Sequence, residues 1–295
     1  MSRLVSVALG QITSRPYSAT ENRELTLATA RDAFARGADL VVLPELIVPS
    51  YGADRARLLA VAEPLDGPTV EAWTQAAARG GGWIAGGFCE RDGDLLYNSA
   101  VIVGADGIAL HYRKLHPFRE EKHAFAPGDL GLPVAELPFG RVGLCVCYDL
   151  RFVETVRVLA LSGAELICVP TAWVTGFDSE RWDERGLAPQ AQGALLQANL
   201  SQVFIACASQ VGVVDGLELL GSSLVADPLG KSQLGPFPGD RSHVDLTSID
   251  LDAVERAQVR DPLIRPREDR RTDVYALSPV DQQGVTALQV GGELQ

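Results

Sequence analysis

The sequence predicts an α/β fold of two similar halves, whose sheets pack against each other with the helices outside. Apolar strands alternate with helices along the 295 residues, and nothing resembles an interdomain linker. The segment GADLVVLPEL, residues 37–46, resembles GAELICVPTA, residues 163–172, and each combines a helix exit with an apolar strand that ends at proline. The alternative is that these two segments are similar by chance, since a helix followed by a strand is a common connection. We expect one domain over residues 1–280 and a tail over residues 281–295.

The first half contains apolar runs bounded by glycine or charged residues, a pattern that predicts strands, and polar–apolar periodicity that predicts helices. In chain order we expect a strand over Leu4 to Gln11, a helix over Thr20 to Arg36 closed by Gly37, a strand over Leu40 to Pro44, a helix over Thr69 to Arg79, and the strands WIAGGFC, LLYNSAVIV and IALHYRK, joined by turns at RDGD and ADG.

The second half repeats this alternation. In order, we expect a strand over Arg141 to Val146, a helix over Val153 to Ser162, a strand over Leu166 to Pro170, a helix over Pro189 to Asn199, the strand VFIACAS, a turn at ADPLGK and the strand SHVDLTSID. A proline ends each of the two echoed strands because it cannot continue the ladder. The residues just beyond, Glu45 and Thr171 to Trp173, therefore lie at carboxyl ends of strands, where α/β sheets place their ligands.

Composition excludes several classes of partner. The formal charge is -12 and there is no basic run, which argues against nucleic acid and anionic membranes. The N-terminal stretch turns polar too soon for a secretory signal, and no apolar run approaches the length of a membrane span. The five cysteines sit in or beside apolar runs and cannot all pair, so we expect a reduced, cytoplasmic protein.

Three residues that carry chemistry lie at strand ends. Glu45 follows VVLP and Lys114 ends IALHYRK; taken alone, each is more commonly a solvated charge. Cys147 lies between a strand and a helix, where a turn exposes a side chain and aims backbone N–H groups at whatever that side chain attacks. A thiol needs a base or a cation to act as a nucleophile at neutral pH. A Glu and a Lys in one apolar cleft supply both.

The stretch GLCVCYDLRF is compatible with several roles for its two cysteines, Cys145 and Cys147. Both can be buried core residues, as free cysteines usually are. A zinc site lacks a second paired ligand set, and a redox pair normally has the spacing C-x-x-C. A Cys–His arrangement would have to use one of the four histidines, His111, His116, His123 and His243.

Four blocks of the sequence together resemble the signature blocks of the nitrilase superfamily, the carbon–nitrogen hydrolases. They are LPELIVPSYG, HYRKLHPF, EKHAFAPGD and GLCVCYDLRF, in family order and with family-like gaps. The resemblance extends from residue 4 to about residue 275 and implies a four-layer α-β-β-α sandwich. It also implies a triad of Glu45, Lys114 and Cys147, an assisting Glu121, and no metal or organic cofactor. Cys147 is then the nucleophile and Cys145 part of the core.

The resemblance implies an amidase, a hydrolase of carbon–nitrogen bonds other than peptide bonds. The expected substrate is a small carboxamide, including ω-amides of dicarboxylic or 2-oxo acids, cleaved to acid and ammonia through a thioester. An N-carbamoyl-amide hydrolase, which also releases carbon dioxide, and a nitrilase are alternatives, and a non-catalytic binding module is a different class. We expect a homodimer or larger homo-oligomer. The oxyanion and substrate contacts are expected from Tyr51, Tyr148, Arg151, Thr171 and Trp173, with Arg181 and Arg185 near the pocket mouth.

Overall fold

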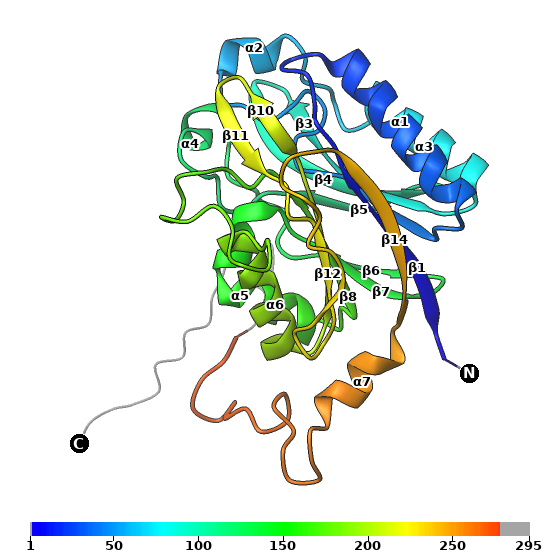
Figure 1. Ribbon diagram of the computed structural model, residues 1–295, viewed down its shortest axis with the longest axis vertical. Helices are drawn as coiled ribbons and strands as arrows, with labels where there is room; N and C mark the ends of the chain where they lie inside the picture. Colours follow the sequence, from blue (N-terminus) through cyan, green and yellow to red (C-terminus); the bar gives the residue numbers. More distant parts are fainter. Residues whose placement is uncertain (1, 278–295) are drawn as a thin grey trace.

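Two six-stranded sheets form the centre of the molecule (Figure 1). The computed structural model describes residues 2–277 of the chain. In spatial order the first sheet contains β14 (His243–Asp250), β1 (Leu4–Gln11), β2 (Leu40–Val42), β3 (Trp83–Asp92), β4 (Leu95–Gly104) and β5 (Gly107–Arg113). The second contains β13 (Ser232–Leu234), β12 (Leu224–Ala226), β9 (Phe204–Ser209), β8 (Leu166–Thr171), β7 (Gly140–Leu144) and β6 (Val134–Leu137).

The two sheets have the same plan, which confirms the prediction of two similar halves. In the first, β1, β2 and β3 are parallel, with antiparallel strands on both sides. In the second, β7, β8 and β9 are parallel and are flanked in the same way. The two echoed segments lead into β2 and β8, which are the middle parallel strands of their sheets.

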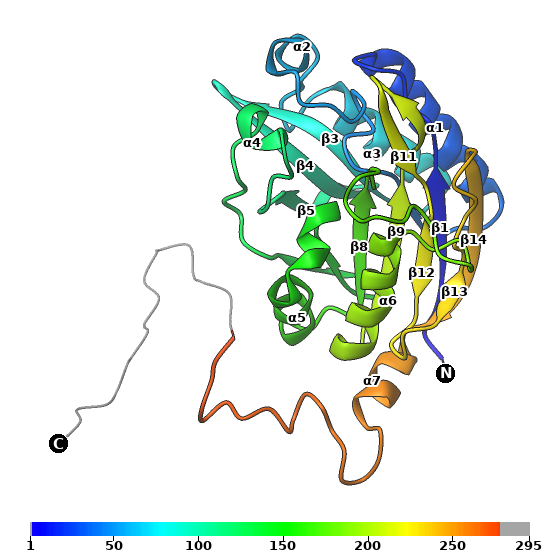
Figure 2. The same cartoon turned by 60° about the vertical axis from the view of Figure 1, so that its left-hand side comes forward.

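Helices cover the outer faces of both sheets, so the fold has the four layers that the resemblance implied (Figures 1 and 2). The helices are α1 (Ala19–Ala35), α2 (Arg55–Leu59), α3 (Pro68–Gly80), α4 (Glu121–Ala124), α5 (Val153–Leu161), α6 (Pro189–Ser201) and α7 (Asp252–Gln258), with a 3₁₀ turn, η1, over Cys147–Arg151. Val7 and Leu9 point between the sheets, whereas Ala8 packs beneath α1 and α3. Alternate side chains of a strand face opposite sides, so a strand buried on both faces is apolar throughout.

The prediction that a proline ends each of the two echoed strands is wrong, because β2 ends at Val42, before Pro44, and β8 continues beyond Pro170. Pro170 lies inside β8, which continues to Thr171, and pairs with Ala208 of β9. The Cys168 carbonyl accepts a hydrogen bond from the Cys145 N–H, on the side of β8 that faces β7. The backbone of Pro170, two residues later, faces the same side. Because β7 ends at Leu144, no hydrogen bond is required there, and a residue without an N–H is tolerated.

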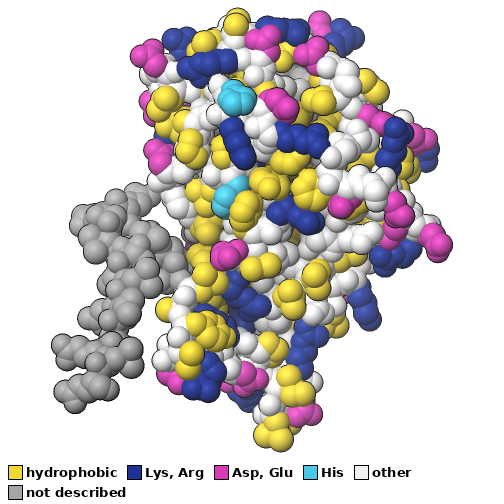
Figure 3. Space-filling view, turned by 90° about the vertical axis from the view of Figure 1, so that its left-hand side faces the viewer, with side chains coloured by type: hydrophobic (Ala, Val, Ile, Leu, Met, Phe, Trp, Pro, Cys, Tyr) yellow, Lys and Arg dark blue, Asp and Glu magenta, His cyan; other side chains and the backbone are white. Residues whose placement is uncertain are grey.

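Several short elements were not predicted from the sequence. These include β6, β12, β13 and the two-stranded hairpin of β10 (Val211–Val214) and β11 (Leu217–Leu220), whose turn at Asp215-Gly216 is a common hairpin signal. The predicted boundary at residue 280 and the tail lie outside the described residues. No helix within residues 2–277 is long and apolar enough to cross a membrane. On the face in Figure 3, charges of both signs are interspersed with apolar side chains.

Candidate active site

Glu45 lies where the middle strands of the two sheets meet. Its backbone N–H donates to the carbonyl of Thr171 at 3.3 Å, and its own carbonyl accepts from Gln210 Nε2 at 2.7 Å. On the neighbouring strand β3, Gly87 donates to the carbonyl of Pro44 at 3.1 Å. A Cβ at Gly87 would lie 2.7 Å from Glu45 Cα, so only glycine allows this approach. The Glu45 side chain is fully buried.

Lys114 joins two buried carboxylates. Its Nζ lies 2.6 Å from Glu45 Oε1 and 2.9 Å from Glu121 Oε2. Glu121 also accepts from the Tyr51 hydroxyl at 2.7 Å and from the Phe118 backbone N–H at 3.1 Å. All three charged side chains are at most 2% exposed. Buried charges are tolerated when they are paired and hydrogen-bonded, as they are here.

Asn98 is a member of this cluster that sequence reasoning missed. Its Nδ2 donates to Glu45 Oε1 at 2.7 Å from strand β4, which lies between β3 and β5 in the first sheet. An amide side chain in the middle of the largely apolar run LLYNSAVIV was the available signal, because a buried amide requires hydrogen-bond partners.

Cys147 begins the η1 turn at the end of β7. Its φ of 47° is in the left-handed region, an unfavourable conformation for a residue with a Cβ. Asp149, fully buried, holds the turn by accepting from the Val146 N–H at 2.9 Å, the Tyr112 hydroxyl at 2.7 Å and the His116 N–H at 3.1 Å. The first residue of η1 is therefore fixed by a network anchored in the core.

The environment keeps the Cys147 thiol protonated and Lys114 charged. Burial raises the pKa of Cys147 well above its ordinary value, and the charge of Glu45 adds to this, while Lys114 and the Ala172 backbone N–H act against it. Burial also raises the pKa of Glu45, against the effect of Lys114. Burial acts to lower the pKa of Lys114, but Glu121 and Glu45 outweigh it and the pKa is raised. The thiol thus needs a base to take its proton as it attacks.

The other four cysteines are core residues. Cys145 is fully buried, as are Cys168 and Cys207, and Cys89 is 1% exposed. β7 ends before Cys145, so the alternation that would have placed Cys145 and Cys147 on one face does not continue to Cys147. Among the described residues no group of three or more His, Cys, Asp or Glu side chains could hold a metal ion.

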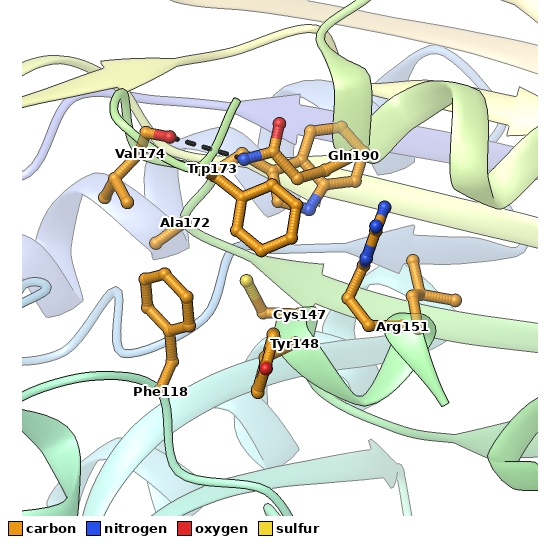
Figure 4. Close-up of a pocket in the computed structure, with 10 residues that line it drawn as sticks. Phe118, Cys147, Tyr148, Arg151, Ala172, Trp173, Val174 and Gln190 are labelled. Carbon is orange, nitrogen blue, oxygen red and sulfur yellow. Dashed lines mark hydrogen bonds between the residues drawn. The ribbon is translucent and has the colours of Figure 1, made fainter. Parts of the chain in front are cut away.

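A hollow of about 350 Å³, including its open mouth, lies in front of Cys147 (Figure 4). Of the predicted substrate contacts, Tyr148, Arg151 and Trp173 line it. Its walls also include residues that the sequence analysis did not name as contacts: Phe118, Leu150, Ala172, Val174, Phe177 and Gln190. Most of these side chains are apolar or aromatic, so the hollow suits an organic acyl group.

The remaining predicted contacts lie elsewhere. Tyr51 donates to Glu121 in the buried cluster and does not line the hollow, and Thr171 is at the junction of the sheets. Arg181 pairs with Glu218 at 2.9 Å and Arg185 with Asp183 at 3.0 Å. Arg151 is different, because its guanidinium lies 4.7 Å over the Phe177 ring and forms no ion pair with a described carboxylate.

Sequence comparison matches residues 6–258 to the carbon–nitrogen hydrolase family. A nitrilase from Pyrococcus abyssi is 35% identical over 92% of this chain and 99% of its own length. An (R)-stereoselective amidase from Pseudomonas sp. is 33% identical over 86% of this chain and 88% of its own.

The fold is also similar to that of an amidase from Nesterenkonia sp. A double mutant of that protein, solved in complex with acrylamide, has a TM-score of 0.76 and 25% identity, covering 92% of this chain and 96% of that one. A single mutant shows Michael addition of acrylamide at the active-site cysteine, with a TM-score of 0.74 and 26% identity, covering 92% of this chain and 98% of that one.

Proposed function

Because this chain belongs to the carbon–nitrogen hydrolase family, the nitrilase superfamily, and is amidase-like, we propose that it hydrolyses a small carboxamide to a carboxylic acid and ammonia. The observation that carries the proposal is the buried cluster of Glu45, Lys114 and Glu121 beside Cys147, at the head of an apolar hollow. The cluster supplies a base and a fixed cation and Cys147 supplies a nucleophile, the three groups that amide cleavage through a thioester requires.

In the first half-reaction, Glu45 accepts the thiol proton while Cys147 Sγ bonds to the amide carbon. The developing oxyanion is held by Lys114 Nζ and the Tyr148 backbone N–H, which donates to no acceptor among the described residues. The proton then passes from Glu45 to the amide nitrogen, the C–N bond breaks and ammonia leaves. A thioester to Cys147 remains.

In the second half-reaction, Glu45 takes a proton from water as the water oxygen attacks the thioester carbon. The C–S bond breaks, the acid is released and the proton returns to Cys147. Glu121 orients Lys114 throughout, because it accepts from Nζ through both of its oxygens, at 3.0 and 2.9 Å. Each role uses the residue that the resemblance assigned to it.

For the substrate we propose an amide whose far end carries a carboxylate, such as an ω-amide of a dicarboxylic or 2-oxo acid. Arg151 supports this because it is a cation in the wall of the hollow without an acid partner among the described residues. Guanidinium binds carboxylate through two parallel hydrogen bonds. The free cysteines support work in a reducing compartment, the cytoplasm. We also propose that residues 1–280 form the catalytic domain.

A panel of small amides, N-carbamoyl compounds and nitriles, assayed for ammonia release, tests the function. We expect turnover of carboxamides by the wild type and none by Cys147→Ala. Release of carbon dioxide with the ammonia would identify a carbamoyl hydrolase instead. An enzyme that releases no ammonia from any compound would contradict the proposal and favour a binding module.

A further inference from the structure

The two oxygens of the Glu45 carboxylate have different surroundings. Oε1 accepts from Lys114 Nζ at 2.6 Å and from Asn98 Nδ2 at 2.7 Å. Oε2 is buried and has no hydrogen-bond partner among the described residues. A buried carboxylate oxygen without a donor is costly, so its presence calls for a functional or structural reason.

Asn98 is placed to act on both Glu45 and Lys114. It lies in β4 opposite Cys89 of β3, and its side chain is almost completely buried. Its backbone carbonyl accepts from the Lys114 N–H at 2.8 Å, while its side chain reaches Glu45. One residue therefore fixes the end of β5, from which Lys114 projects, and one edge of the Glu45 carboxylate.

We propose that Asn98 is a positioning residue: together with Lys114 it saturates Glu45 Oε1, so that Oε2 alone accepts the proton of Cys147 and, later, that of the attacking water. The proposal rests on the proposed function. A carboxylate oxygen has two lone-pair sites, and two donors occupy both on Oε1. Lys114 alone would not fix this orientation, because its ammonium group also donates to the Glu121 carboxylate.

The proton path follows from this orientation. As Cys147 Sγ bonds to the amide carbon, its proton moves to Oε2 and from there to the leaving nitrogen. In the second half-reaction, Oε2 takes a proton from water while the C–S bond breaks, and that proton returns to the thiol. Neither transfer displaces a hydrogen bond on Oε1.

The test uses two substitutions of Asn98. Asn98→Ala removes the donor, and Asn98→Asp keeps the shape but replaces the donor with an acceptor. We expect kcat to fall by about 10- to 100-fold with KM little changed, because a misaligned base loses part of its contribution. Melting temperature reports separately whether each variant folds.

The pH profile gives a readout that a purely structural role would not move. Loss of a hydrogen bond to the ionised carboxylate raises the pKa of Glu45. Activity that needs ionised Glu45 is lost as pH falls, so the acid limb of kcat/KM should move to higher pH, further for Asn98→Asp. The titratable groups that face Glu45 are Lys114 from the end of β5, Glu121 from α4, Cys147 from η1 and Tyr51 from the segment after β2.

Alkylation by iodoacetamide measures the same step without a known substrate. Cys147 Sγ bonds to the reagent's methylene carbon, iodide leaves, and the proton passes to Oε2. Intact-protein mass spectrometry, with Cys147→Ala as the unreactive reference, should show alkylation at least about tenfold slower in both Asn98 variants. The other four cysteines are buried.

Ser99→Ala is the matched control. Ser99 is the next residue of β4, is equally buried, and donates to Glu90 instead of Glu45. Ser99→Ala should lower the melting temperature without shifting the acid limb of kcat/KM or changing the alkylation rate. A wild-type acid limb together with a wild-type alkylation rate in Asn98→Ala would overturn the proposal. If the wild type releases no ammonia from any amide, the proposed function is refuted instead. The alkylation rates then still test the role of Asn98, because they require no substrate.

Discussion

Lys114 Nζ lies 2.6 Å from Glu45 Oε1, and both side chains are almost completely excluded from solvent. The same ammonium group reaches Glu121 at 2.9 Å, so one buried cation is shared by two buried carboxylates. Charges buried this deeply interact more strongly than at the surface, and their positions are fixed before a substrate arrives. The geometry therefore places a permanent positive charge beside the Cys147 thiol.

Lys114→Ala should lower kcat by about 10²–10³-fold, the usual effect of losing one oxyanion donor. It should also destabilise the protein by about 3–5 kcal/mol, because two buried carboxylates lose their shared partner. Steady-state kinetics and urea unfolding measure the two effects. A change in KM alone would reassign Lys114 to substrate binding.

Cys147→Ala should abolish turnover, whereas Cys145→Ala should retain it. Cys145 is fully buried, so its truncation leaves a small void and should cost about 1 kcal/mol of stability. Ammonia release and thermal unfolding distinguish the two variants. Wild-type ammonia release by Cys147→Ala would refute the whole assignment of the site.

Asp149→Asn should lower kcat at least about tenfold, because it disturbs the turn that carries Cys147. Asp149 only accepts hydrogen bonds. The NH2 of an amide would face either the Tyr112 hydroxyl and the Val146 N–H, which both donate to Oδ2, or the His116 N–H, which donates to Oδ1. We expect a stability loss of about 1–3 kcal/mol from the buried group left unpaired. Tyr112→Phe removes only one of the donors to Asp149, together with the long hydrogen bond from the Leu115 N–H at 3.3 Å, and should have a smaller effect. Full activity of Asp149→Asn would show that the network does not position the nucleophile.

Much of the arrangement follows from sequence, for identifiable reasons. The strands β2 and β8 were predictable because runs such as LVV and LICV are apolar on both faces. Their ends brought Glu45 to the Thr171 carbonyl, as expected for corresponding strands of two packed sheets. The four signature blocks then identified Lys114, Glu121 and Cys147 as candidates.

The rest depends on tertiary contacts that periodicity does not contain. Asn98 acquires its significance only because β4 pairs beside the end of β5, which places it on Glu45. Pro170 is tolerated inside β8 because a different strand, β7, has already ended. Phe177 lines the hollow from a loop without regular structure, and loop geometry is not encoded in a short repeat.

Light scattering at micromolar concentration should give the mass of a homodimer or larger assembly. Leu196 and Leu200 are 59% and 44% exposed on one face of α6, and Val153 at the start of α5 is 57% exposed. Trp173 and Val174 are buried within the chain and do not contribute to such a face. Leu196→Glu combined with Leu200→Glu should yield monomers, because charges there prevent burial of the face. A wild-type monomer would refute the prediction.

Succinamate should be a better substrate than butyramide, an uncharged amide of similar length, when the two are compared by kcat/KM. The overall charge of -12 repels an anion, so its capture must depend on a local cation, and Arg151 is a cation in the wall of the hollow. Arg151→Met keeps an apolar stem against Phe177 but removes the charge. It should lower kcat/KM for succinamate by about 10- to 100-fold, the loss of a charge-assisted hydrogen-bond pair, and leave that for butyramide nearly unchanged. Arg181→Met is the control, because Arg181 already pairs with Glu218 and should affect neither substrate. A higher kcat/KM for butyramide in the wild type would remove the case for a carboxylate site and indicate a general aliphatic amidase.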